Sequence, residues 1–294
     1  MSLAPLPVTV ISGYLGAGKT SLVNHLLRNA GGRRIMVMVN DFGALDIDAD
    51  LLESATEDTL TLANGCVCCT MGTELLYALS DALDRRPRPD CLVIEASGVA
   101  DPAKIAAAAH AEPEMTYSGI VTMADAASLA ERLADLLIGA QVAGQFRGAD
   151  LILVTRTDIA DFGAARALLA PLSAAPVIEA PMGAAPVDLL LDRPEAAPPA
   201  PGGHDHGADY ASWSTKGGRV SLAGLRALLG APPPGLYRFK GFAMTGEGAV
   251  EAQLVGRSFT VKPSAETETR AVAIGPKPLF DPEGFGAAWG KIAL

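Results

Sequence analysis

The sequence has little positive charge, and its apolar residues do not gather into long runs. Its 294 residues include 23 lysines and arginines against 33 aspartates and glutamates, which gives a net charge of −10. An acidic chain of this kind is a poor ligand for nucleic acid or for anionic membranes. No apolar run approaches the roughly 20 residues of a membrane span. We therefore expect neither nucleic acid nor a membrane among its partners.

The N-terminus lacks the basic segment of a secretory signal, and cysteine is scarce. The first apolar stretch leads directly into a glycine-rich turn, so we expect no signal peptide. The four cysteines are Cys66, Cys68, Cys69 and Cys91. Three of them fall within four residues, which is too close for an ordinary disulfide framework. We therefore expect a reduced, cytoplasmic protein whose clustered thiols are available to a metal.

What the sequence does contain is a phosphate-binding loop near its beginning. Residues 8–11 predict a strand, and the pattern G-x-x-x-x-G-K-[ST] follows it, with a helix after that. Glycines let successive backbone N–H groups face one anion, and the helix presents the positive end of its dipole to the same point. Lys19 can reach the β- and γ-phosphates, and the Thr20 hydroxyl can hold Mg²⁺. The residues predicted to bind the nucleotide here are Gly13, Gly16, Ala17, Gly18, Lys19, Thr20 and Ser21. The sequence therefore predicts a nucleoside triphosphate site.

Acidic residues stand at the ends of two further predicted strands. Residues 34–40 predict a buried strand followed by Asp41, and residues 91–95 predict another that ends in Glu95. The carboxyl ends of parallel strands form the edge where ligands bind. Asp41 can hold Mg²⁺ or orient the attacking water, and Glu95 can ligate or order the Mg²⁺ shell. The alternative for Asp41 is an Asx-turn that starts a solvated loop. We expect the Gly98 amide to face the γ-phosphate, so that loss of this phosphate releases the next segment.

Cys66, Cys68 and Cys69 precede a helix predicted for residues 72–83. The positive end of a helix dipole favours the thiolate, which is the metal-binding form of cysteine. Three thiols in C-x-C-C spacing cannot close a four-cysteine site, so the motif predicts an open site that loads and releases a transition metal. The alternative is a set of small cysteines that only pack in a core.

Composition predicts two domains. Residues 1–192 alternate strands and helices, as in a doubly wound, mostly parallel α/β sheet, with leucines from 129 to 137 predicting one of the helices. Residues 193–209 are rich in proline, glycine and alanine and predict a linker. Residues 210–294 contain strand-like pieces and a helix near 221–229, which predict a smaller α+β domain without a catalytic cluster.

Several motifs together resemble those of the CobW family of metal-handling GTPases. They are the phosphate loop at 13–20, Asn-Asp-Phe-Gly at 40–43, Asn-Gly-Cys-Val-Cys-Cys at 64–69 and Glu-Ala-Ser-Gly-Val-Ala-Asp-Pro at 95–102. Residues 236–242 resemble the start of the family's C-terminal domain. The resemblance implies a GTPase that uses GTP and Mg²⁺, works slowly without metal or client, and holds Zn²⁺ or Co²⁺ at the three cysteines. It also implies delivery of the ion to a client metalloprotein or metal-insertion complex, with a homodimer as a further option.

This chain departs from the family at its guanine-reading motif. In place of N-K-x-D it has Thr155, Arg156, Thr157 and Asp158. By resemblance, Asp158 accepts from guanine N1 and N2, and Arg156 lies over the base as lysine would, while Thr155 lacks an amide's hydrogen-bonding groups. Guanine is favoured, and an ATP-dependent phosphate-loop enzyme stays the alternative. A second alternative is a GTP-gated zinc sensor or sequestration protein. Asp41 replaces the family's glutamate. This weakens the case for a metal site at Asp41, so we expect the cysteines to form the metal site.

Overall fold

The computed structural model describes residues 4–40, 59–62, 73–191, 198, 210–255, 258–277 and 279–294. Asp41, Cys66, Cys68 and Cys69 therefore lie outside the described residues. The chain forms two compact units, one with the described residues up to 198 and the other with residues 210–294. Each unit has its own sheet, and each is described by itself below.

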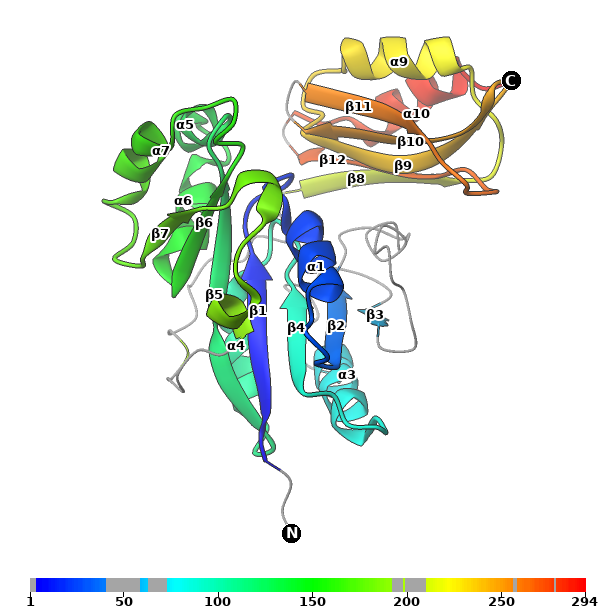
Figure 1. Ribbon diagram of the computed structural model, residues 1–294. Coiled ribbons are helices and arrows are strands. Elements are labelled where there is room, and N and C mark those ends of the chain that lie inside the picture. The colour runs from blue at the N-terminus through cyan, green and yellow to red at the C-terminus, as the bar shows by residue number, and fades with distance from the viewer. Residues whose placement is uncertain are drawn as a thin grey trace. The chain divides into compact units, whose positions relative to one another are not determined.

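The first unit is built on a sheet of seven strands in the order β3-β2-β4-β1-β5-β6-β7 (Figure 1). The strands are β1 (Leu6–Ser12), β2 (Ile35–Asn40), β3 (Thr59–Leu62), β4 (Cys91–Glu95), β5 (Met115–Asp125), β6 (Leu151–Thr155) and β7 (Val177–Glu179). All of these neighbours pair in parallel, as expected of short runs rich in Val, Ile and Leu. The pairing of Ile11 with Glu95 brings the end of β4 beside the end of β1.

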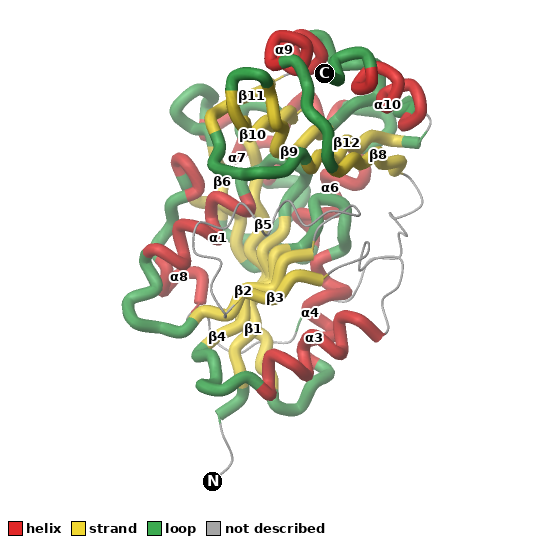
Figure 2. The backbone as a smooth tube through the Cα atoms, turned by 90° about the vertical axis from the view of Figure 1, so that its right-hand side faces the viewer, coloured by secondary structure: helices red, strands yellow, loops and turns green. Residues whose placement is uncertain are grey.

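Helices cover both faces of this sheet. Figure 2 shows α1 and α8 on one side of the strands and α3 and α4 on the other. Their bounds are α1 (Lys19–Arg28), α3 (Thr73–Asp84), α4 (Pro102–His110) and α8 (Val187–Leu191). Leu22 of α1 shares a core with Val93, whereas Leu79 of α3 shares the opposite core with Ile94, the next residue of the same strand. Successive residues of a strand thus point into two different cores, one on each face of the sheet. The predicted doubly wound α/β fold is confirmed.

The connection between β5 and β6 differs from the prediction. The single helix predicted across residues 129–137 is wrong, because α5 (Leu129–Ala134) stops there and α6 (Gly139–Arg147) follows. Asp135 is the cause: its Oδ1 accepts hydrogen bonds from the backbone N–H groups of Leu137 and Ile138 at 2.8 and 3.2 Å. An aspartate side chain that accepts hydrogen bonds from the following backbone N–H groups competes with the helical hydrogen bonds, so the helix ends and the chain turns. After β6 come α7 (Phe162–Leu169) and, beyond β7, the short turn η1 (Pro181–Gly183).

The second unit is an antiparallel sheet with helices packed against it. Its strand order is β11-β10-β9-β12-β8. The elements are β8 (Tyr210–Lys216), α9 (Leu222–Gly230), β9 (Arg238–Thr245), β10 (Gly248–Val255), β11 (Ser258–Pro263), β12 (Arg270–Pro276) and α10 (Pro282–Gly290). Leu225 of α9 and Phe285 of α10 share one core with Phe239 of β9, so both helices pack on the same face. This is the α+β arrangement that the sequence predicted. None of the helices in the described ranges is long and apolar enough to cross a bilayer.

Candidate nucleotide-binding site

The phosphate loop joins β1 to α1 in a conformation that only glycine permits at two points. Gly13 has φ 133° and Gly18 has φ 101°. A Cβ placed at Gly13 would lie 2.5 Å from the carbonyl oxygen of Met123, so any side chain there would collide with β5. Gly18 is the N-cap of α1 and has no side chain with which to bond the first N–H groups of the helix. These N–H groups are therefore available to an anion that binds in the loop.

A cation, a hydroxyl and a carboxylate meet at this loop. The side chain of Lys19 is buried, and its Nζ donates to the Gly13 carbonyl oxygen at 2.9 Å, which holds it across the loop. The Thr20 hydroxyl donates to Oε1 of Glu95 at 3.1 Å. Glu95 ends β4 and is only 3% exposed. A hydroxyl and a carboxylate are the hard oxygen ligands that Mg²⁺ prefers, so the donor set fits this ion.

The segment that follows β4 packs directly on the phosphate loop. A Cβ placed at Gly98 would lie 2.7 Å from the backbone nitrogen of Leu15 and 2.6 Å from its Cδ2. The neighbouring Ser97 is buried, and its Oγ accepts a hydrogen bond from the Val99 N–H at 3.4 Å. Glycine is thus the residue that lets this backbone lie against the loop. The predicted position of Gly98 beside the phosphates remains a prediction, and this packing supports it.

The residues predicted to read the base lie at the carboxyl end of β6 and directly after it. Thr155 is buried, and its hydroxyl lies 3.1 Å from the carbonyl oxygen of Ala17 and 3.3 Å from that of Ala124. Its one proton serves one of these acceptors at a time, so Thr155 connects β6 with the phosphate loop rather than pointing at solvent. Asp158 is exposed, and its predicted role in reading the base remains a prediction.

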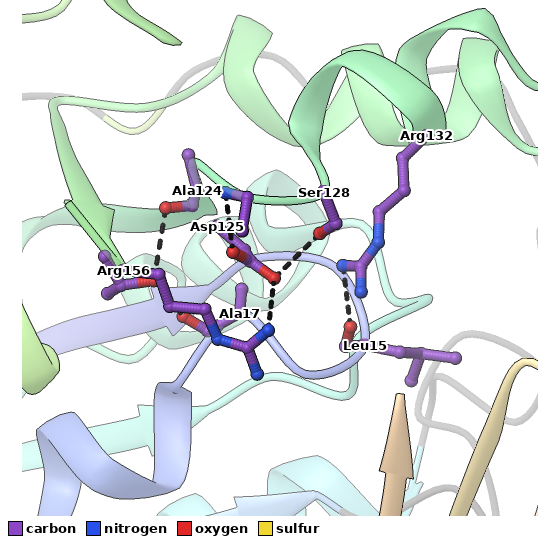
Figure 3. Close-up of polar contacts among 9 residues, drawn as sticks. Leu15, Ala17, Ala124, Asp125, Ser128, Arg132 and Arg156 are labelled. Carbon is purple, nitrogen blue, oxygen red and sulfur yellow. Dashed lines mark hydrogen bonds and ion pairs between the residues drawn. The ribbon is translucent and has the colours of Figure 1, made fainter. Parts of the chain in front are cut away.

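Arg156 adopts an uncommon backbone conformation and forms an ion pair. Its φ is 56°, in the left-handed region that non-glycine residues rarely occupy. Its Nη1 lies 3.2 Å from Oδ2 of Asp125, the buried last residue of β5 (Figure 3). Asp125 also accepts from the Ala127 N–H at 3.0 Å and from the Ser128 hydroxyl at 2.7 Å. The guanidinium is therefore anchored to the end of β5. The predicted position of Arg156 over a base remains a prediction.

Arg132 of α5 reaches the phosphate loop from the other side. Its Nη1 donates to the Leu15 carbonyl oxygen at 2.8 Å (Figure 3), and its guanidinium carbon lies 5.2 Å from the centre of the Tyr14 ring. Neither Arg132 nor the role of Asp125 was predicted. Asp125 carried a readable signal, because it ends a parallel strand as Glu95 does. Arg132 carried none, because a sequence does not show which loop a helical arginine meets.

The predicted metal motif cannot be placed, because Cys66, Cys68 and Cys69 lie outside the described residues, as does Asp41. Within the described ranges, no three His, Cys, Asp or Glu side chains gather into a group that could hold a metal. Cys91 is buried in β4, away from the carboxyl end of that strand.

Comparison with known proteins identifies similar chains. The "Zinc chaperone CobW" of Sinorhizobium sp is 37% identical over 191 residues, 55% of this chain and 54% of that protein. The "Zinc chaperone YjiA" of Escherichia coli K12 is 36% identical over 164 residues, 53% of this chain and 51% of that protein. The chain thus spans about half the length of these curated relatives. The crystal structure of Zn(II)-bound YjiA GTPase from E. coli aligns over 99% of both chains with 25% identity and a TM-score of 0.47.

The family model "CobW/HypB/UreG, nucleotide-binding domain" matches residues 7–174, which is more than half of the chain. The matched region contains the phosphate loop, the Glu95 strand and the segment from Thr155 to Asp158. The family model therefore covers the same residues that carry the sequence motifs and form the site. The chain belongs to the CobW/HypB/UreG family of nucleotide-binding proteins.

Proposed function

We propose that this chain binds and hydrolyses GTP and uses the nucleotide state to control zinc or cobalt binding at Cys66, Cys68 and Cys69. The observation that carries the nucleotide half is the contact of the Thr20 hydroxyl with the buried Glu95 carboxylate, at the mouth of a loop that holds Lys19. The names of the relatives, zinc chaperones, support the metal half.

The phosphate loop supplies the binding and the charge. Lys19 and the backbone N–H groups between Gly13 and Gly18 neutralise phosphate oxygens, and Gly98 offers its amide to the γ-phosphate. Thr20 and Glu95 hold Mg²⁺, directly or through water, and Asp41 is assigned the ordering of the attacking water. When bound, Mg²⁺ supplies positive charge to the β- and γ-phosphate oxygens. Since most of these groups are positioned by protein contacts, they act with little reorganisation.

In this proposal, the Asp158 carboxylate accepts hydrogen bonds from guanine N1 and N2. Arg156 lies against the face of the base. The Arg156–Asp125 ion pair supports this, because it fixes where the arginine stem lies. An ATP-dependent enzyme is the rival on the same loop. Competition of ATP and GTP for the site separates the two, with GTP expected to win.

The cysteine motif is assigned the transition metal, which is the cargo of the protein. Thiolates are soft ligands that suit zinc or cobalt rather than magnesium. Because the thiols must lose protons on binding, metal affinity should fall as the pH drops below their pKa values. In sequence the motif lies between the strand that precedes Asp41 and the strand that ends in Glu95. Nucleotide and metal affinities are therefore expected to be linked, and by the same factor in both directions.

A competitive zinc titration against a chromophoric chelator tests the coupling. Zinc affinity is measured with GDP and with a non-hydrolysable GTP analogue, and we expect the two to differ by about 5- to 150-fold. Changing Cys66, Cys68 and Cys69 to serine should remove the tight zinc site, whereas Cys91→Ala, the matched control, should keep it. Lys19→Ala should abolish tight triphosphate binding, and with it the difference between the two nucleotides.

Two outcomes would contradict the proposal. Equal zinc affinity with both nucleotides would mean that a nucleotide site and a metal site only share a chain. Full affinity in the triple serine variant would remove the cysteines from the metal site. Turnover that rises when a client metalloprotein is added favours the delivery role, whereas turnover independent of any client favours the sensor or sequestration role.

A further inference from the structure

Helix α6 presents two buried glutamines to the segment that follows Gly98. Gln141 and Gln145 are one helical turn apart and are 7% and 2% exposed. Nε2 of Gln141 donates to the carbonyl oxygen of Val99 at 3.2 Å, and Nε2 of Gln145 donates to that of Ala100 at 2.9 Å. Two successive peptide groups are thus held by one face of one helix.

Packing alone gives a poor account of a glutamine at these positions. Leucine or methionine would fill the same space without burying an amide. The Oε1 of Gln145 is buried and accepts no hydrogen bond from any residue that the structure describes. Such an acceptor lowers stability. The Nε2 bond to Ala100 offsets this loss, so the amide at this position is explained by its contact with the segment and not by apolar packing.

The segment held by the glutamines is the one placed against the phosphate loop. Val99 and Ala100 follow Gly98 directly, and the Gly98 backbone touches Leu15 of the loop. Arg132, on the preceding helix α5, bonds the carbonyl oxygen of that same Leu15. Helix α5 thus holds the phosphate loop, and helix α6 holds the segment that packs against that loop.

We propose that Gln141 and Gln145 are positioning residues for the Gly98 amide. They fix residues 98–100 in the conformation that meets the γ-phosphate, and they thereby raise the affinity for GTP relative to GDP. This inference rests on the proposed GTP site and adds the residues that make it sensitive to the third phosphate. GDP lacks that phosphate, so its binding depends on the phosphate loop and not on this segment.

Nucleotide affinities of isosteric variants test the inference. Methionine matches glutamine in length but cannot donate, so Gln141→Met and Gln145→Met each remove one bond to the segment. Calorimetry with Mg²⁺ should show each variant binding a non-hydrolysable GTP analogue about 2- to 10-fold more weakly, the range of one hydrogen bond, with GDP affinity unchanged. Val142→Ala is the matched control, because Val142 is buried on the same helix and makes neither bond. Its ratio of analogue to GDP affinity should equal that of the native chain.

The outcomes separate the inference from the proposed function. Native ratios in both methionine variants would show that the glutamines only satisfy two backbone carbonyls, which overturns the inference and leaves the GTP site intact. An equal fall in Val142→Ala would overturn it too, because general packing of α6 would then set the ratio. Absence of guanine nucleotide binding by the native chain would remove the proposed function itself. Retained GDP affinity in each variant shows that the fold has survived the substitution.

Discussion

Three side chains of the nucleotide site are held by contacts within the protein. Lys19 bonds the Gly13 carbonyl, Thr20 bonds Glu95, and Thr155 bonds the loop carbonyl of Ala17. The ordering of these groups is completed on folding, so binding a nucleotide has less conformational entropy to overcome. Thr155 stands where the family motif has asparagine. It lacks the amide's NH₂ donor, but its hydroxyl connects β6 with the phosphate loop.

Asp158→Asn should weaken guanine nucleotides selectively. A carboxylate can accept from both guanine N1 and N2, whereas an amide oxygen can accept only part of this pair and the NH₂ group opposes the donors. We expect a loss of about 1–3 kcal/mol for GDP and GTP alike, which is the effect of leaving a polar partner unmet. Calorimetry with GDP, GTP and ATP measures it.

Asp84→Asn, which also removes one exposed carboxylate but at the end of α3, serves as the control and should bind as the native chain does. If the native chain bound ATP as tightly as GTP, the assignment of Asp158 to guanine would be wrong.

The helices between β5 and β6 contact the phosphate loop and the segment beside it, although neither helix was assigned to the site from the sequence. From α5, Arg132 holds the phosphate loop at Leu15. From α6, Gln141 and Gln145 hold the carbonyls of Val99 and Ala100. The turn at Asp135 makes this division possible, because a single straight helix would present one face to one segment.

Arg132→Met should lower the affinity for GDP and for the GTP analogue by the same factor. The substitution keeps much of the apolar stem but removes the bond to the Leu15 carbonyl and the charge near the Tyr14 ring. Both nucleotides share the phosphate loop, so we expect a uniform loss of about 1.5–3 kcal/mol, the range for a hydrogen bond from a charged group.

Arg147→Met provides the control, because Arg147 is exposed on α6 and its loss leaves the loop unchanged. A change in the ratio of the two affinities in Arg132→Met would show that this arginine acts on the γ-phosphate rather than on the loop.

The two units have separate hydrophobic cores. In the first, helices on both faces of a parallel sheet form two layers of packing. In the second, Phe239, Phe285 and Trp289 pack between an antiparallel sheet and its helices, with Trp213 at 4.9 Å from the Phe285 ring. Since each core is assembled from one unit's own residues, each unit is expected to unfold as its own cooperative transition.

Nucleotide should therefore stabilise one transition and not the other. Both tryptophans, Trp213 and Trp289, belong to the second unit, so tryptophan fluorescence reports that unit, whereas far-UV circular dichroism reports both. At 100 times its Kd, GDP with Mg²⁺ should stabilise the first unit by about 2.7 kcal/mol. We expect the midpoint of its dichroism transition to rise by roughly 5–10 °C while the fluorescence midpoint stays.

In Lys19→Ala, GDP should leave the dichroism midpoint of the first unit unchanged as well. Movement of the fluorescence transition in step with the dichroism transition would mean that the two cores unfold together.

The sequence by itself determined the features that depend on neighbours along the chain. The phosphate loop is a local pattern of glycines, Lys19 and Thr20, and it was readable because its chemistry is carried by adjacent residues. The buried strands and the acid at the end of one of them, Glu95, were readable for the same reason. Strand alternation with helices then predicted the doubly wound class, and the structure has that fold.

Only the tertiary structure decided which distant residues meet the loop. The contacts of Thr155 with Ala17, of Arg132 with Leu15 and of Gln145 with Ala100 join residues 138, 117 and 45 positions apart. No periodicity or composition encodes such pairs, because an arginine or a glutamine on a helix has the same local signature whether it faces solvent or a backbone carbonyl. They exist because the parallel sheet places the carboxyl ends of β1, β4, β5 and β6 at one edge, where their connections must pack against one another.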